Sequence, residues 1–134
     1  ASSPPHITVS TPFSAPACPP ETGASTDAEV RTCLERLETL LHSDAGPYAL
    51  IIDVREAELP TIGQLRTTAA SVRANEGAAV VKLAGVAFVT ENVTTMAAVH
   101  ALFDLAPTGV PWTIEGRLSK ARAWARAQLS ETRA

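Results

Sequence analysis

The chain has 134 residues and a mass of 14.0 kDa, the size of one domain that can enclose its own hydrophobic core. Apolar residues make up 46% and charged residues 19%, a composition that excludes an intrinsically disordered chain. Eleven basic against fourteen acidic residues give a net charge of −3. A nucleic-acid partner would require an excess of Lys and Arg on one face, so we expect no nucleic-acid binding.

The sequence predicts no contact with a membrane, no metal site and no cofactor. No apolar run approaches the roughly 18 residues that span a bilayer, and Ala1–Pro5 lacks the basic and apolar regions of a signal peptide. Cys18 and Cys33 are too few for a structural zinc site, and no Gly-rich phosphate loop follows a strand. We therefore expect a cytoplasmic protein with two reduced thiols.

The first 25 residues are rich in Pro, Ser and Thr, and we expect them to be poorly ordered or to form an edge strand. Ile7–Thr11 alternates apolar and polar side chains, which is typical of a half-buried strand. Three prolines between residues 16 and 20 exclude a long central strand, so an edge hairpin is the most that is expected there. The α/β domain itself is predicted over residues 26–134.

The first helix is predicted to begin after Thr26. Thr26 and Glu29 have the spacing of a capping box, in which the two side chains satisfy N–H groups that the first turn leaves unpaired. Gly46 and Pro47 end this helix. Its apolar stripe is expected at Val30, Cys33, Leu34, Leu37, Leu40 and Leu41.

Two buried strands and a second helix follow. Tyr48–Val54 is a continuous apolar run, which is typical of a parallel strand that is buried on both faces. The next strand is predicted at Val86–Thr90, with its start near Val80. The helix between them begins after Thr61 and ends before Gly77. Its inward residues are expected to be Ile62, Leu65, Ala69 and Val72.

The third helix is predicted to begin after Asn92, a favoured capping residue, and to end before Pro107. Its inward residues are expected to be Val93, Met96, Ala97, Val99 and Phe103. Pro111–Glu115 is the last strand, and Ser119 caps the last helix. That helix is expected to bury Leu118, Ala121, Trp124, Ala125 and Leu129 and to expose Lys120, Arg122 and Arg126.

Strands that alternate with helices predict βαβ units and an α/β fold. We expect a mainly parallel sheet of four to five strands, packed with about four helices. These helices should be shared between both faces of the sheet, or should lie three on one side if a partner shields the other.

Tyr48–Ile62, with the sequence YALIIDVREAELPTI, resembles the strand, acidic residue, loop and helix start of the STAS domain family. This is the SpoIIAA-like fold of bacterial anti-sigma-factor antagonists. Gly85–Val89 and the Ala-rich stretch 121–125 are similar to later parts of the family, so that the resemblance covers about residues 26–130. Small stand-alone STAS-like proteins of delta-proteobacteria are similar in the same way. The resemblance implies a SpoIIAA-like sandwich and a non-enzymatic regulatory module that binds a partner protein, an anti-sigma factor or a kinase.

The resemblance also implies where the partner binds, namely the loop 55–61 and the start of the second helix. The residues at these positions are Arg55, Glu58, Thr61 and Gln64. Regulated family members carry a phosphorylated serine before this helix, and that serine is absent here. Thr61 lies within about one residue of its place, where the helix N-terminus would favour a phosphate. Thr61 is thus a candidate phosphoacceptor, although its residue type and position favour a simple helix cap.

Two other functions are alternatives to the interaction module. For the oligomeric state, we expect a monomer or a weak homodimer. Some STAS relatives bind nucleotides, lipids or anions, which would require an apolar pocket between the sheet and the second helix. Such a pocket would be lined by Ile52, Leu65, Val89 and Phe103. An enzyme would have to use Asp53 or His100. We expect instead that Asp53 accepts backbone N–H bonds in the adjacent loop and that His100 is a packed or edge residue.

Overall fold

The computed structural model describes residues 6–10, 14–18, 27–42, 47–55, 59 and 61–133. Its strands are β1 (His6–Ser10), β2 (Ser14–Cys18), β3 (Tyr48–Asp53), β4 (Leu83–Val89) and β5 (Trp112–Glu115). Its helices are α1 (Asp27–Leu41), α2 (Ile62–Ala74), α3 (Glu76–Lys82), α4 (Val93–Leu105) and α5 (Leu118–Arg133). The predicted cap at Thr26 and the predicted stop at Gly46 lie outside the described residues.

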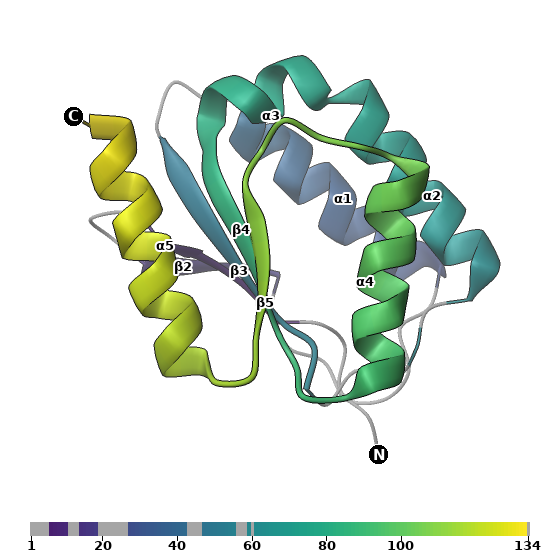
Figure 1. The fold of residues 1–134 in the computed structure, drawn as a ribbon. Helices are drawn as coiled ribbons and strands as arrows, with labels where there is room; N and C mark the ends of the chain where they lie inside the picture. Colours follow the sequence, from purple (N-terminus) through teal and green to yellow (C-terminus); the bar gives the residue numbers. More distant parts are fainter. Residues whose placement is uncertain are drawn as a thin grey trace.

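The five strands form one sheet in the order β2-β1-β3-β4-β5 (Figure 1). The strands β3, β4 and β5 run parallel, whereas β1 is antiparallel to both β2 and β3. The α/β class is confirmed, but the parallel part has three strands, fewer than the four to five expected. The predicted hairpin exists as β1 and β2, and it extends the sheet beyond β3.

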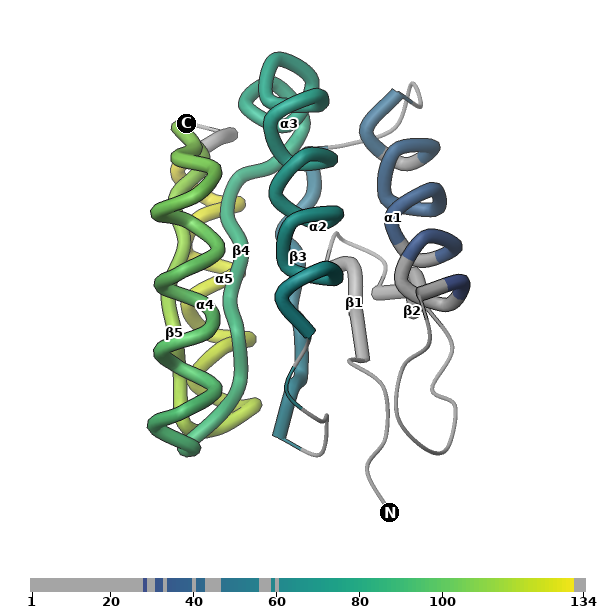
Figure 2. The backbone as a smooth tube through the Cα atoms, turned by 90° about the vertical axis from the view of Figure 1, so that its right-hand side faces the viewer, coloured from purple at the N-terminus to yellow at the C-terminus, as the bar shows by residue number. Residues whose placement is uncertain are grey.

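Helices cover both faces of the sheet, but unequally. Among the helices that the structure describes, α1, α2, α3 and α4 lie on one face and only α5 lies on the other (Figures 1 and 2). Because side chains alternate along a strand, β3 and β4 each supply both cores. Leu50, Val86 and Phe88 pack against α1, α3 and α4, whereas Ile51, Ala87 and Val89 face α5.

The core under α5 is built from small residues. Ala49, Ala84 and Ala87 of the sheet meet Ala121 and Ala125 of the helix, and all five are buried. Small side chains on both sides let one helix pack closely on three parallel strands. The predicted inner and outer faces of α5 are confirmed.

The strand predicted from near Val80 begins later, at Leu83, because residues 76–82 form the additional helix α3. The thirteen residues of α2 rise by about 20 Å, close to the length of about 23 Å of the seven-residue β4. At Asn75 the chain has therefore returned along the length of the sheet, and the short helix α3 carries it across to the start of β4 (Figure 1). Gly77 accordingly lies inside α3 and does not follow the end of α2.

Three apolar residues that were predicted to point inward are exposed, namely Ile62 at the start of α2 and Val93 and Ala97 in α4. The other predicted inward residues of these two helices are buried or half-buried. In α1, Leu34, Leu37 and Leu41 follow the predicted stripe, while the side chains of its other members lie outside the described residues. The helices in the described ranges are all too short or too polar to cross a lipid bilayer.

Candidate interaction surface at the carboxyl edge of the sheet

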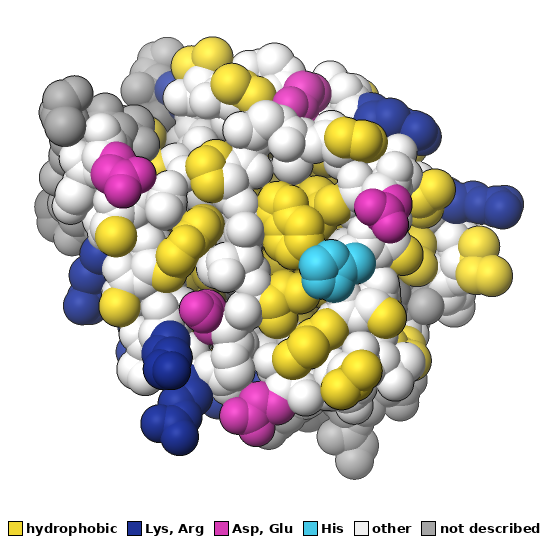
Figure 3. Space-filling view, in the orientation of Figure 1, with side chains coloured by type: hydrophobic (Ala, Val, Ile, Leu, Met, Phe, Trp, Pro, Cys, Tyr) yellow, Lys and Arg dark blue, Asp and Glu magenta, His cyan; other side chains and the backbone are white. Residues whose placement is uncertain are grey.

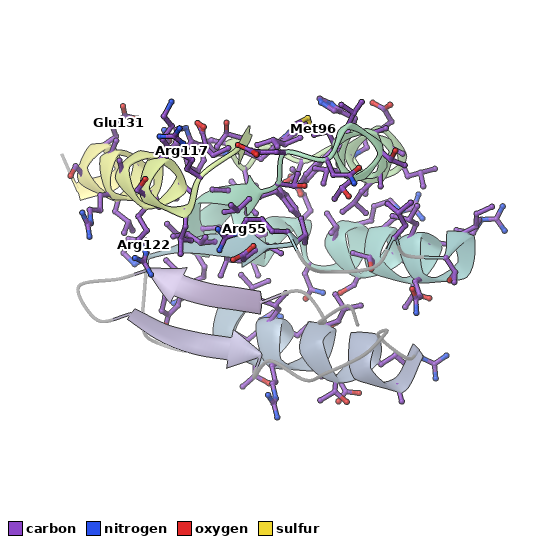
Figure 4. The ribbon with its side chains drawn as sticks, turned by 90° about the horizontal axis from the view of Figure 1, so that it is seen from below. Arg55, Met96, Arg117, Arg122 and Glu131 are labelled. Carbon is purple, nitrogen blue, oxygen red and sulfur yellow. The ribbon has the colours of Figure 1, made fainter. Side chains whose placement is uncertain are left out.

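The carboxyl ends of β3, β4 and β5 meet at one edge of the sheet, which Figure 4 views directly. Two backbone bonds tie these ends together: Val54 N–H donates to Val89 O at 3.1 Å, and Thr90 N–H donates to Glu115 O at 2.9 Å. Thr90 is buried, and its hydroxyl accepts the N–H of Asn92 at 3.1 Å. Hydrogen bonds therefore hold in place the strand ends from which the loops at this edge begin.

Thr61 and Gln64 cap the start of α2 reciprocally. Gln64 N–H donates to Thr61 Oγ1 at 3.1 Å, and Thr61 N–H donates to Gln64 Oε1 at 3.0 Å. These bonds satisfy two groups that the first turn of a helix leaves unpaired. The interpretation of Thr61 as a helix cap is thus confirmed, while its phosphorylation stays a prediction.

Asn92 performs the same task for α4, as predicted. Its Oδ1 accepts the N–H groups of Thr94 at 2.9 Å and Thr95 at 3.2 Å. The starts of α2 and α4 are therefore both anchored at the carboxyl edge of the sheet.

Asp53, the last residue of β3, holds Arg55 in a two-pronged ion pair. Arg55 Nε donates to Asp53 Oδ1 at 2.9 Å, and Nη2 donates to Oδ2 at 2.6 Å. The backbone N–H of Arg55 also donates to Oδ1 at 3.1 Å, which confirms that Asp53 accepts a backbone bond in the adjacent loop. Both oxygens are occupied by the guanidinium, an arrangement that suits a structural carboxylate better than a general base.

Large apolar side chains are exposed at the same edge. Leu59 is 51% exposed, Ile62 is 70% exposed and Val93 is 78% exposed. Leu59 precedes α2, and the other two are the first helical residues after the caps Thr61 and Asn92. All three therefore lie where the chain has just left a parallel strand. Sequence periodicity placed Ile62 and Val93 on the inner stripes, whereas the structure exposes both side chains.

Three of the four predicted partner-binding residues are described, and they share this edge. Arg55 is fixed on Asp53 and lies between the two helical layers (Figure 4), while Thr61 and Gln64 form the cap of α2. Glu58 lies outside the described residues. Their contact with a partner protein stays a prediction.

The predicted ligand pocket is not assembled as expected. Ile52 and Phe103 pack in the core between the sheet and the four helices, and Leu65 packs between α2 and α4. Val89, however, faces α5 on the opposite side of the sheet. Its place next to Phe88 in β4 explains the error, because neighbouring residues of a strand point to opposite faces.

His100 lies in α4, with its ring edge-on to Trp112 at a centroid distance of 5.2 Å. Trp112 in turn stacks on Phe103 at 4.4 Å. This agrees with the expectation of an edge residue. Among the described side chains, no group of three His, Cys, Asp or Glu residues could hold a metal ion.

No protein-family model, no curated protein and no solved structure matches the chain. The geometry of the carboxyl edge is therefore the basis for the functional inference.

Proposed function

We propose that this chain is a non-enzymatic regulatory module that binds a partner protein at the carboxyl edge of its sheet. This is the role implied by the resemblance to STAS-like anti-sigma-factor antagonists, and it places the protein in the cytoplasm. The partner class that follows is an anti-sigma factor or a kinase.

The observation that carries the proposal is the exposure of Leu59, Ile62 and Val93 along one edge. Full burial of such a side chain contributes about 1.5–3 kcal/mol, so a partner that covers all three could gain several kcal/mol. These three side chains flank the polar caps of α2 and α4, and apolar side chains beside polar ones are typical of a protein interface.

The polar groups around these three residues are held in place before any partner arrives. Asp53 orients Arg55 through both guanidinium contacts, and the caps fix the first turns of α2 and α4. A prearranged surface loses little conformational entropy on binding, which favours affinity. Phosphorylation of Thr61 would add negative charge at the centre of this surface and would change its fit to a partner.

The test is isothermal titration of the purified chain against each regulatory protein encoded by neighbouring genes. A matched pair of variants locates the binding surface: Val93→Glu at the carboxyl edge and Val81→Glu at the other end of β4. The two valines are almost equally exposed, at 78% and 76%, so the variants differ in position and hardly in burial.

We expect Val93→Glu to weaken binding by at least about tenfold, because it would bury a charge in the interface, and Val81→Glu to leave it unchanged. Equal losses of affinity in both variants, or no loss in Val93→Glu, would show that the partner does not bind at the carboxyl edge. Unchanged affinity after replacement of Arg55, Glu58 and Thr61 would also show that these residues do not contact the partner.

A further inference from the structure

Half-buried aromatic side chains gather between α4 and β5. The ring of Phe103 stacks on Trp112 at a centroid distance of 4.4 Å, and the exposed His100 meets the same indole edge-on at 5.2 Å. Ile114 lies two residues further along β5 and packs on the same core. Phe103, Trp112 and Ile114 each keep part of their surface in contact with water. Aromatic side chains of this kind are enriched at protein interfaces.

These side chains border a hollow in the surface. Figure 3 looks onto the β5 edge of the molecule and shows hydrophobic side chains that line this hollow between β5 and α4. Met96 lies on the side of α4 that faces β5 (Figure 4). Met96, His100 and Phe103 are spaced by four and three residues, so they form one continuous line along the helix. The apolar surface therefore extends lengthwise along α4.

The charged residues of this part of the chain all have one sign. The stretch from Leu83 to Gly116, which supplies β4, α4 and β5, contains no Lys or Arg. Its charged residues are all acidic, namely Glu91, Asp104 and Glu115. Arg117, the first basic residue after the stretch, lies on α5, where Glu131 is on the same side of the helix (Figure 4). A partner that covers the hollow therefore meets mainly negative charge.

Two of the carboxylates stand at opposite ends of the hollow. Asp104 is exposed and follows His100 by four residues, so both lie on the same side of α4. Glu91 is exposed before the start of α4 and reaches the end of β5, where its Oε1 lies 3.1 Å from a Cβ atom built on Gly116. The thirteen residues of α4 span about 20 Å. The two negative charges are therefore separated by about this length, with apolar surface between them.

The shape of this surface suits a helix better than a strand. His100 and Phe103 of α4 pack on Trp112, so a strand added to the outer side of β5 would collide with α4 (Figure 2). A helix is about 10–12 Å wide and can rest on α4 and β5 together from outside. Apolar side chains at every third or fourth position would follow the apolar line of α4. Basic side chains near its two ends would meet Asp104 and Glu91.

We propose that the hollow between α4 and β5 binds an amphipathic helix of a partner protein, with an apolar centre and basic residues in its first and last turns. This inference goes beyond the proposed function, which uses the exposed apolar residues at the starts of α2 and α4. The two surfaces adjoin at the start of α4, but binding at either one does not require binding at the other.

The test titrates the nitrogen-15-labelled full chain with a synthetic peptide and follows the amide and indole N–H signals by NMR. The peptide is a helix of about 18 residues, about 27 Å long, with a stripe of leucines and with lysines in its first and last turns. A second peptide carries glutamate in place of each lysine. The chain has two tryptophans, so Trp112 reports on the hollow, and Trp124, which packs under α5, is the internal control.

We expect the lysine peptide to shift the indole signal of Trp112 and to bind at least about tenfold more tightly than the glutamate peptide. The indole signal of Trp124 should not move. An unshifted Trp112 signal at millimolar peptide, or equal affinities for the two peptides, would overturn the proposal.

Matched charge reversals locate the binding site. Asp104→Lys and Glu35→Lys change the net charge equally at exposed positions, but Glu35 lies in α1, which packs near β2 at the opposite edge of the sheet from β5. Asp104→Lys should weaken binding of the lysine peptide by about five- to tenfold, and Glu35→Lys by less than about twofold. Far-UV circular dichroism shows whether each variant is folded. Equal losses in the two variants would mean that the peptide is attracted only by the overall negative charge, and the proposal would be wrong.

Discussion

Gly85 of β4 lies directly beneath the indole ring of Trp124 of α5. A Cβ atom built on Gly85 would come within 2.6 Å of Trp124 Cη2, which is closer than carbon atoms approach without a shift. The absence of a side chain at this one position lets α5 pack close to the sheet, where it contacts β3, β4 and β5.

Gly85→Ala should therefore destabilise the protein by about 1–3 kcal/mol, the usual cost of overpacking a core. The matched control is Gly77→Ala in α3, where an added Cβ has no atom within 4 Å. That change should stabilise by about 0.5–1 kcal/mol, because alanine favours a helix over glycine. Urea denaturation monitored by circular dichroism measures both, and equal effects would show that α5 does not pack on Gly85.

Truncation of two isoleucines compares a position in the core with a position at the carboxyl edge of the sheet. Ile51 is 1% exposed, whereas Ile62 is 70% exposed. Ile51→Ala should cost about 2–5 kcal/mol, since it leaves a cavity in the core. Ile62→Ala should change the free energy of unfolding by no more than about 0.5 kcal/mol. A large cost for Ile62→Ala would mean that this side chain is buried.

Loss of the cap of α2 should be measurable. Thr61→Ala removes the acceptor of Gln64 N–H and should cost about 0.5–2 kcal/mol. Thr67→Ala, in the same helix, removes only a bond from its hydroxyl to Gly63 O and should stay within about 0.5 kcal/mol. Thermal unfolding of the two variants compares them, and the cap would be unimportant if their melting temperatures coincided.

The ion pair of Asp53 and Arg55 should contribute little to stability. The Arg55 side chain is 47% exposed, and exposed pairs are worth about 0.2–1 kcal/mol. A double-mutant cycle with Asp53→Ala and Arg55→Ala isolates the coupling of the two side chains. The coupling should fall as salt is added. A coupling well above this range would assign the pair a role in folding as well as in orienting Arg55.

Much of the fold could be predicted from the sequence, because local patterns determine it. The unbroken apolar run at Tyr48–Val54 predicted a buried parallel strand, and the residues Thr61 and Asn92 marked two helix starts. The alternation of Ile7–Thr11 predicted β1. In each case a period or a cap within one short segment carries the information.

Features that depend on how helices and strands are placed relative to one another could not be predicted in this way. The β-branched pair Val80 and Val81 favoured an early start of the strand, but both residues belong to the helix α3. Exposure of Ile62 and Val93 depends on where the first turns of their helices stand relative to the sheet. Helical periodicity contains no information about that position. The exposed apolar residues of the candidate surface were therefore missed.

Hydrogen–deuterium exchange of the chain with and without its bound partner tests the central claim most directly, because it locates the interface by segment. We expect slower exchange in residues 59–66 and 90–97, where the exposed apolar residues and the two caps lie. Segments of α5 should exchange at unchanged rates. Protection confined to α5, with none at the starts of α2 and α4, would show that the partner does not bind at the carboxyl edge.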